Sequence, residues 1–303
     1  MRMNRPRRGY SLVELIVSMA ILGIVGGILA QIMMGQQRFF QRTVEQQGIR
    51  RELRTSINLL PTELRGLSSS GGDLVTFTSS SVTFRSTIGT SIVCAKTGTT
   101  TIDVPPLSAA KSIMTAWYTT PIAGDTLFTM YSDSSGAKGD YWSAHRITSV
   151  ATATSYCAGS AYLDATNDAG KSRYRYVVTP ALPDSVVAGS PIRFSRTGRY
   201  SLLQQSSGSF YLTRTEYLSG AWGTGVPVSG PFQAPGNSGA GGLTFTFYDS
   251  TGAAVASAAN ASNVARMDVM MRAQGRSSSG TFGGASNSII DSLTFRIALR
   301  NRR

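Results

Sequence analysis

The chain has 303 residues, of which 41% are hydrophobic and 15% are charged, and its formal net charge is +13. A chain of this length and hydrophobicity can bury a core, which excludes an intrinsically disordered protein. One histidine and two cysteines without CxxC spacing also exclude a cysteine–histidine zinc site and a thioredoxin-type motif, so we expect no cofactor and no metal.

Residues 1–9 form a short basic leader that contains Arg2, Arg5, Arg7 and Arg8. Removing these four charges from +13 leaves +9 for the rest of the chain. The other basic residues are dispersed, which favours a solvated helix face and a basic C-terminal tail. Contact with nucleic acid or with an anionic phospholipid surface stays open as an alternative.

Residues 10–35 are predicted to form a transmembrane helix. The run from Leu12 to Gly35 (LVELIVSMAILGIVGGILAQIMMG) contains Glu14 as its only charge. As a helix it would be about 36 Å long, which is enough to cross a bilayer. Because the basic leader precedes it and no comparable basic cluster follows at once, the leader should stay cytoplasmic. We therefore expect a single-pass inner-membrane protein whose C-terminal domain is extracytoplasmic.

An acid near the start of an apolar span is unusual, because a carboxylate at the bilayer centre costs on the order of 3 kcal/mol. Cleavage between Gly9 and Tyr10 would create a new α-amine and would place Glu14 at the fifth mature position. In a helical array of staggered subunits, the acid of one chain could then meet the amine of a neighbour.

The segment Arg8–Ile16 (RGYSLVELI) resembles the type IV prepilin cleavage and methylation motif. The resemblance implies that a prepilin peptidase cuts after Gly9 and N-methylates Tyr10, and that Glu14 is the assembly acid. Tyr10 departs from the phenylalanine usual in the family, but it keeps the aromatic ring. The rival interpretations are an ordinary signal anchor and a secretory signal peptide that is cut after Ala30.

Residues 36–65 are predicted to continue the helix with an amphipathic pattern, since their apolar residues recur mainly at spacings of three and four. We expect this helix to reach about Leu60. Pro61 would then end it or begin a final turn, and Gly66 starts the exit from the helix.

Residues 66–303 are predicted to form a β-rich globular domain, which gives the whole chain an α+β fold. Strands are expected at residues 74–78, 82–86, 113–118, 126–131, 192–195 and 210–215. Three further strands near the C-terminus alternate apolar and polar residues around Phe245, Val269 and Phe295, so each should bury one face. The Gly- and Pro-rich stretch Gly220–Gly242 is predicted to be a long surface loop.

Few residues in this domain suggest chemistry. Cys94 and Cys157 could form one disulfide or remain two buried thiols, because sequence spacing alone does not fix their separation. His145 has no evident catalytic or zinc-binding partners, so a strand or surface position is expected. The segment Asp164–Gly170 lacks most of the carboxylates of a calcium loop and should be a solvated turn.

The segment Phe245–Asp249 (FTFYD), followed by Gly252, is similar to a strand and turn of the J- and W-type minor pilins. This second resemblance implies a PilW-like minor pilin, which is a structural subunit and not an enzyme. Its expected partners are other pilins, the prepilin peptidase, the pilus assembly platform and the inner membrane. A J-type pseudopilin of type II secretion and a tip adhesin or DNA-uptake subunit stay open as alternatives.

Overall fold

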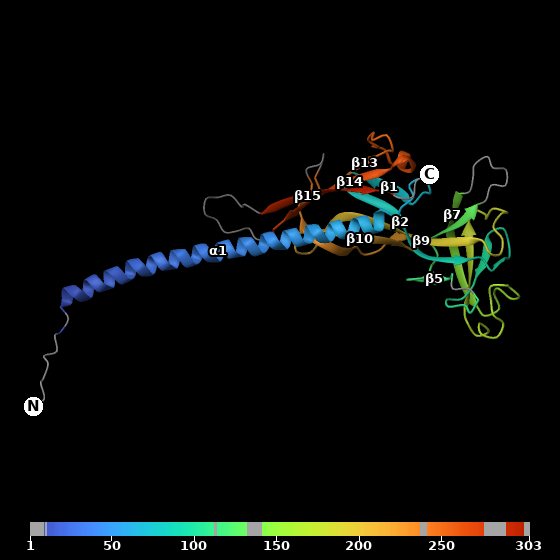
Figure 1. Cartoon of the computed structure of the whole chain (residues 1–303), viewed down its shortest axis with the longest axis horizontal. Coiled ribbons are helices and arrows are strands. Elements are labelled where there is room, and N and C mark those ends of the chain that lie inside the picture. Colours follow the sequence, from blue (N-terminus) through green and yellow to red (C-terminus); the bar gives the residue numbers. More distant parts are fainter. Residues whose placement is uncertain are drawn as a thin grey trace, which may run out of the picture. The chain divides into compact units, whose positions relative to one another are not determined.

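The computed structural model describes residues 9, 11–111, 114–131, 141–236, 241–275 and 289–299. It has the predicted α+β fold, with a long N-terminal helix and an antiparallel β-rich part (Figure 1). The chain divides into two compact units, Met1–Gly48 and Ile49–Arg303. The second unit therefore includes the last turns of the helix together with all the strands.

The helix α1 spans Leu12–Leu64, four residues beyond the predicted end. Pro61 lies inside its last turn, where the backbone continues with a 3.0 Å hydrogen bond from the Arg65 N–H to the Pro61 carbonyl. Leu60 and Leu64 are both fully buried. Their packing explains why the helix continues past a proline that disfavours it.

The first hydrophobic core lies between the end of α1 and one part of the sheet. Ile49, Leu53, Leu60 and Leu64 of α1 contribute to it, and Ser56 of the same face donates a 2.9 Å hydrogen bond to Ser229. The strands of this part are β1 (Leu74–Thr78), β2 (Ser81–Ile92), β9 (Pro191–Gln204), β10 (Phe210–Leu218), β11 (Ala221–Trp222), β12 (Val226–Phe232), β13 (Leu243–Tyr248), β14 (Arg266–Gln274) and β15 (Ile290–Ala298); the short helix η1 is Ala258–Asn263.

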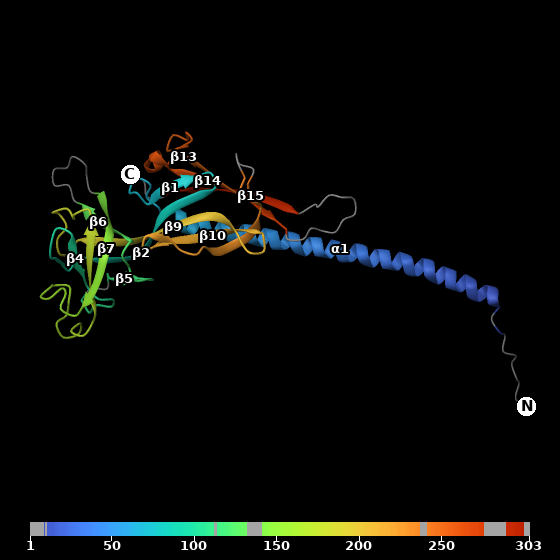
Figure 2. The same ribbon diagram turned by 180° about the vertical axis from the view of Figure 1, so that it is seen from behind.

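A second hydrophobic core forms farther along β2 and β9. It is built by residues that include Ile102, Leu127, Ile147 and Tyr176. The additional strands here are β3 (Ala95–Lys96), β4 (Thr101–Val104), β5 (Ala116–Trp117), β6 (Thr126–Tyr131), β7 (Tyr141–Ala153) and β8 (Arg173–Thr179). Figure 2 shows β4, β6 and β7 together at the far ends of β2 and β9. Every described strand pairing is antiparallel.

A buried charged cluster separates the two cores along β9. This strand gives Phe194 to the second core and Tyr200 to the first, and Arg196 lies between them. The Arg196 guanidinium donates two hydrogen bonds of 2.9 Å to the Asp125 carboxylate, and both side chains are more than 90% buried. These bonds raise the pKa of Arg196 above its ordinary value. Arg196 and Arg214 also form ion pairs with Glu216.

Most strand predictions are confirmed, including 74–78, 126–131 and the three near the C-terminus. The predicted strand at 113–118 is confirmed only for Ala116–Trp117, and residues 112–113 lie outside the described residues. The predicted loop Gly220–Gly242 is wrong in part, because β11 and β12 form inside it. There Gly230 adopts a φ of +141° and Pro231 follows in the strand, while β12 pairs with β10 and touches β14 at one residue pair.

Candidate processing and assembly segment

A serine caps the first turn of α1. The Ser11 hydroxyl accepts a 3.2 Å hydrogen bond from the Glu14 backbone N–H, and the Ser11 carbonyl accepts one of 3.2 Å from Leu15. The sequence Ser11-Leu12-Val13-Glu14 has the spacing of a capping box, with the acid at the third helical position. This cap fixes the start of the helix immediately after the expected cleavage point.

The structure describes two of the three expected site residues, Gly9 and Glu14. Gly9 is exposed, and Tyr10 lies outside the described residues. Glu14 is exposed in the first helical turn, where a carboxylate is favoured by the positive end of the helix dipole. Within the described part of the chain, no hydrogen bond or ion pair is formed by the Glu14 carboxylate.

The apolar surface of the first part of this helix is not covered by any residue that the structure describes. All residues from Ser11 to Arg42 that carry large apolar side chains are exposed, including Leu12, Leu22 and Phe39. The helix is long and apolar enough to cross a membrane, and none of its most apolar 18-residue window is buried. Leaving so much apolar area in water is unfavourable by about 25 cal/mol per Å². This segment therefore requires a lipid or protein environment.

Comparison with known families gives a match at this same segment. Residues 4–30 match the family described as the prokaryotic N-terminal methylation motif. The chain carries a prepilin-type methylation motif. This motif supports a type IV pilin-like or pseudopilin protein, and it implies processing by prepilin peptidase and assembly with other pilins. The motif family is structural, not enzymatic. No curated protein and no solved structure matches the chain.

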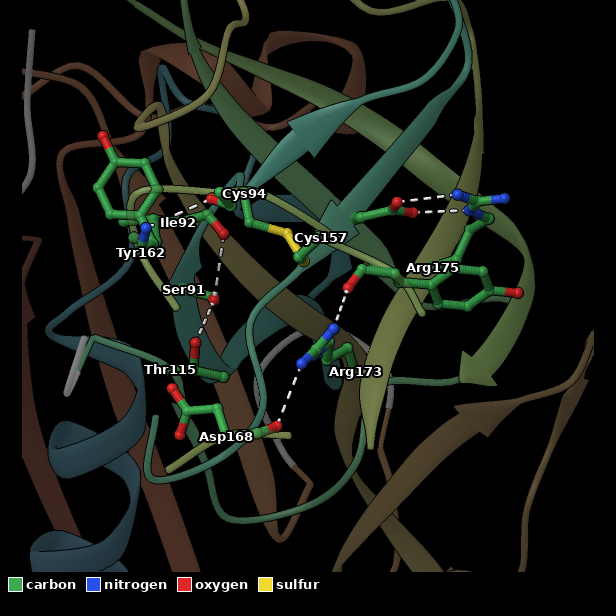
Figure 3. Close-up of a disulfide and its surroundings, with 12 residues drawn as sticks. Ser91, Ile92, Cys94, Thr115, Cys157, Tyr162, Asp168, Arg173 and Arg175 are labelled. Atoms are coloured by element: carbon green, nitrogen blue, oxygen red, sulfur yellow. Dashed lines mark hydrogen bonds and ion pairs between the residues drawn. A yellow bond between two sulfur atoms is a disulfide. The ribbon is translucent and has the colours of Figure 1, made fainter. Parts of the chain in front are cut away.

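The two cysteines belong to the second unit. Cys94 follows β2 and Cys157 lies in the connection from β7 to β8, and the structure joins them in a disulfide with a Cα–Cα distance of 5.5 Å (Figure 3). Both residues are buried and pack with Leu163. The disulfide belongs in an oxidising compartment, in keeping with an extracytoplasmic domain.

The segment Asp164–Gly170 is the turn that was expected and most of it is exposed, but the Asp168 side chain is fully buried. Its carboxylate accepts hydrogen bonds from the Lys171 ammonium at 2.8 Å and from the backbone N–H groups of Asp164 and Ala110. Lys171 and these amides hold the pKa of Asp168 at about 2. Since its oxygens already bind N–H donors, Asp168 anchors this loop and is not arranged as a calcium ligand.

His145 lies in β7 with 1% of its surface exposed. Its Nδ1 lies 2.9 Å from the Pro180 carbonyl and its Nε2 lies 3.2 Å from the Thr129 hydroxyl. Burial lowers the pKa of the imidazole below its ordinary value, which favours its neutral form. No group of three or more histidine, cysteine or acidic residues that could hold a metal occurs among the residues the structure describes.

Sequence reasoning missed two features that matter for this protein. The capping role of Ser11 was readable from its spacing of three to Glu14. The pairing of Arg196 with Asp125 was not readable, because the two residues are 71 positions apart and their carboxylate–guanidinium contact depends on the register of β6 against β9.

Proposed function

We propose that this chain is a minor type IV pilin of the PilW-like group. It is cleaved after Gly9 and N-methylated at Tyr10, and its membrane helix then joins the helical centre of a filament. The observation that carries the proposal is an exposed apolar helix with one acid, Glu14, in its first turn, for which the described residues offer neither a cover nor a partner. A filament made of packed helices supplies both the apolar surroundings and the neighbouring amine.

The steps of assembly follow from the chemistry of this segment. Before cleavage, the basic leader holds the N-terminus on the cytoplasmic side of the inner membrane, and the β-rich unit lies outside. Cleavage removes the leader charges and leaves one α-amine close to Glu14. Since an isolated charge in hydrocarbon is costly, an amine and a carboxylate from adjoining subunits are more stable as a pair than apart. The assembly platform then extrudes the filament, and the β-rich unit is placed on its surface or tip.

Substitution of Glu14 tests this proposal. We expect Glu14→Ala to reduce incorporation into sheared filaments by about tenfold or more, since the neighbouring amine would be left unpaired. Gln31→Ala serves as the matched control, because it removes an exposed polar side chain from the same apolar segment without removing a charge. Equal incorporation of the two variants and the unmodified chain would contradict the role of Glu14.

A separate experiment distinguishes a pilus subunit from a pseudopilin of type II secretion. A pilus subunit predicts that deletion of the gene reduces surface pili and leaves protein secretion intact. A J-type pseudopilin predicts the opposite pattern. An adhesin or DNA-uptake role predicts intact pili together with loss of surface attachment or of DNA binding, the latter weakening steeply as salt is raised.

A further inference from the structure

The strand β15 forms one edge of the sheet over the first core. It pairs with β14 across nine consecutive residue pairs, from Ile290 opposite Gln274 to Ala298 opposite Arg266, with no register shift. In the described ranges of the chain, no other strand pairs with β15. One whole edge of a straight, regular strand is therefore unpaired there (Figure 1).

The hydrogen-bond register shows which backbone groups point to that edge. The Leu299 N–H donates to the Ala265 carbonyl at 3.0 Å, and the Gly275 N–H donates to the Ile289 carbonyl at 2.8 Å. Hydrogen-bonded and non-hydrogen-bonded pairs alternate in an antiparallel ladder, so the odd-numbered residues of β15 bond to β14. The N–H and C=O groups of the even-numbered residues point to the free edge, and all five of these residues are exposed: Ile290, Ser292, Thr294, Arg296 and Ala298.

The hydrophobic core also ends abruptly at β15. On the inner face of β14, Met267, Val269 and Met271 are completely buried. One strand farther out, Leu293 and Phe295 pack against the same core but are only half-buried. A further strand beside β15 would cover these two side chains and continue the apolar inner face.

The edge lacks several of the features by which proteins prevent strand addition, although it carries the exposed charge of Arg296. Residues 290–298 contain no proline and no lysine, and the pairing has no bulge. The one inward-pointing charge, Asp291, is paired with Arg50 of α1 at 3.2 Å. A regular edge of nine residues without a bulge, proline or lysine can act as a template for another extended chain.

We propose that the free edge of β15 receives an extended segment from a neighbouring filament subunit, which adds as a further strand of the sheet. The inference rests on the proposed function, because the filament supplies the neighbour. The incoming segment alternates apolar and polar residues, with the apolar ones beside Leu293 and Phe295. Its other face carries an acidic residue beside Arg296, the charged residue among the five edge residues, whose side chain is 65% exposed.

The charge of Arg296 argues against a second copy of the chain as the partner. Two copies joined edge to edge would offer Arg296 no acid, because the outward-facing residues of β15 are Ile290, Ser292, Thr294, Arg296 and Ala298. A different pilin-like subunit with an acidic residue on its strand supplies that partner. The partner is therefore assigned as a neighbouring subunit of different sequence.

Proline substitution on the edge tests the proposal in the full chain. Thr294→Pro removes an N–H that points to the free edge and keeps every hydrogen bond between β15 and β14. The strand should therefore tolerate this substitution. We expect Thr294→Pro to be incorporated into filaments about tenfold less than the unmodified chain, while Thr294→Ala, which keeps the N–H, is incorporated normally. Normal incorporation of a folded Thr294→Pro variant would overturn the inference.

A photo-cross-linking experiment covers the case in which the proline variant fails to fold. A benzoylphenylalanine at Ser292, on the free edge, should cross-link to another subunit in filaments and not in detergent-solubilised monomers. The same group at Thr246, an exposed residue of β13, is the control. Absence of a cross-link at Ser292 in filaments that contain the chain would overturn the edge inference. Failure of the unmodified chain to enter filaments would instead contradict the proposed function.

Discussion

The two ends of α1 meet different surroundings although they belong to one continuous helix. From Ser11 to Arg42 every described residue is exposed, whereas Ile49, Leu53, Ser56, Leu60 and Leu64 are buried against the sheet. The described residues of the second unit form a core of their own, whereas those of the first unit up to Arg42 do not. In the first half of the helix apolar residues occur on all sides, and in the second half they lie on one side. One helix can therefore have an exposed apolar half and a half that packs on a sheet.

The largest effect expected within the second unit comes from breaking the buried ion pair between its two cores. Asp125→Ala would remove both 2.9 Å hydrogen bonds to the buried Arg196 guanidinium and leave Glu216 at 3.6 Å as its ion-pair partner, which costs about 3 to 5 kcal/mol of unfolding free energy. Denaturant unfolding in mild detergent measures this loss. The control is Arg50→Ala, whose exposed ion pair with Asp291 should contribute less than about 1 kcal/mol. Similar losses in both variants would contradict the buried cluster as a stabilising feature.

Removal of the disulfide is expected to destabilise the second unit and leave the first unchanged. The Cys94–Cys157 bond closes a loop of 63 residues, for which chain entropy gives about 4 kcal/mol. A variant with both Cys94→Ser and Cys157→Ser should show this loss by urea unfolding. Its membrane helix, followed by far-ultraviolet circular dichroism in micelles, should keep its helicity. Melting of the helix together with the sheet would show that the two units are coupled.

A pair of leucine substitutions tests the contrast along α1 directly. Leu53 is 3% exposed and Leu22 is 76% exposed. Leu53→Ala should lower the unfolding free energy of the second unit by about 3 kcal/mol, because it leaves a cavity in the first core. Leu22→Ala should change that free energy by less than about 0.5 kcal/mol, since the residue touches no part of that core. Equal losses of unfolding free energy in the two variants would contradict the difference between the two halves of α1.

The smallest expected effect is a pH dependence that comes from His145. In the unfolded chain its pKa is near the ordinary value of about 6.5, while burial lowers its pKa in the folded chain. The unfolded state thus binds the extra proton first, and stability should fall as the pH drops below about 6.5. Melting curves between about pH 7.5 and pH 5.5 should show a shallower decline for His145→Gln. Identical pH slopes would show that His145 titrates normally.

The parts of the fold that sequence predicts well are those governed by local patterns. Alternation around Phe245, Val269 and Phe295 gave three correct strands, because each has one buried face. The strand β7 was missed, since its exposed face mixes Ser, Thr and Ala with few apolar residues. β12 was mistaken for loop because Pro227 and Pro231 disfavour strands, and only its pairing with β10 keeps it extended.

The candidate site was predictable for a different reason, namely that its residues are contiguous. Leader, cleavage point, aromatic residue and acid occur within Arg2–Glu14, so their order alone defines the motif. Long-range pairings had no such signal. The state of Cys94 and Cys157, the burial of Asp168 and the free edge of β15 all depend on which strands become neighbours.

The N-terminal mass of the chain recovered from filaments tests the central claim most directly. The account predicts a mature chain that begins with N-methylated Tyr10, so that Glu14 occupies the fifth position. A chain that begins at Gln31, or one that retains Met1, would contradict it.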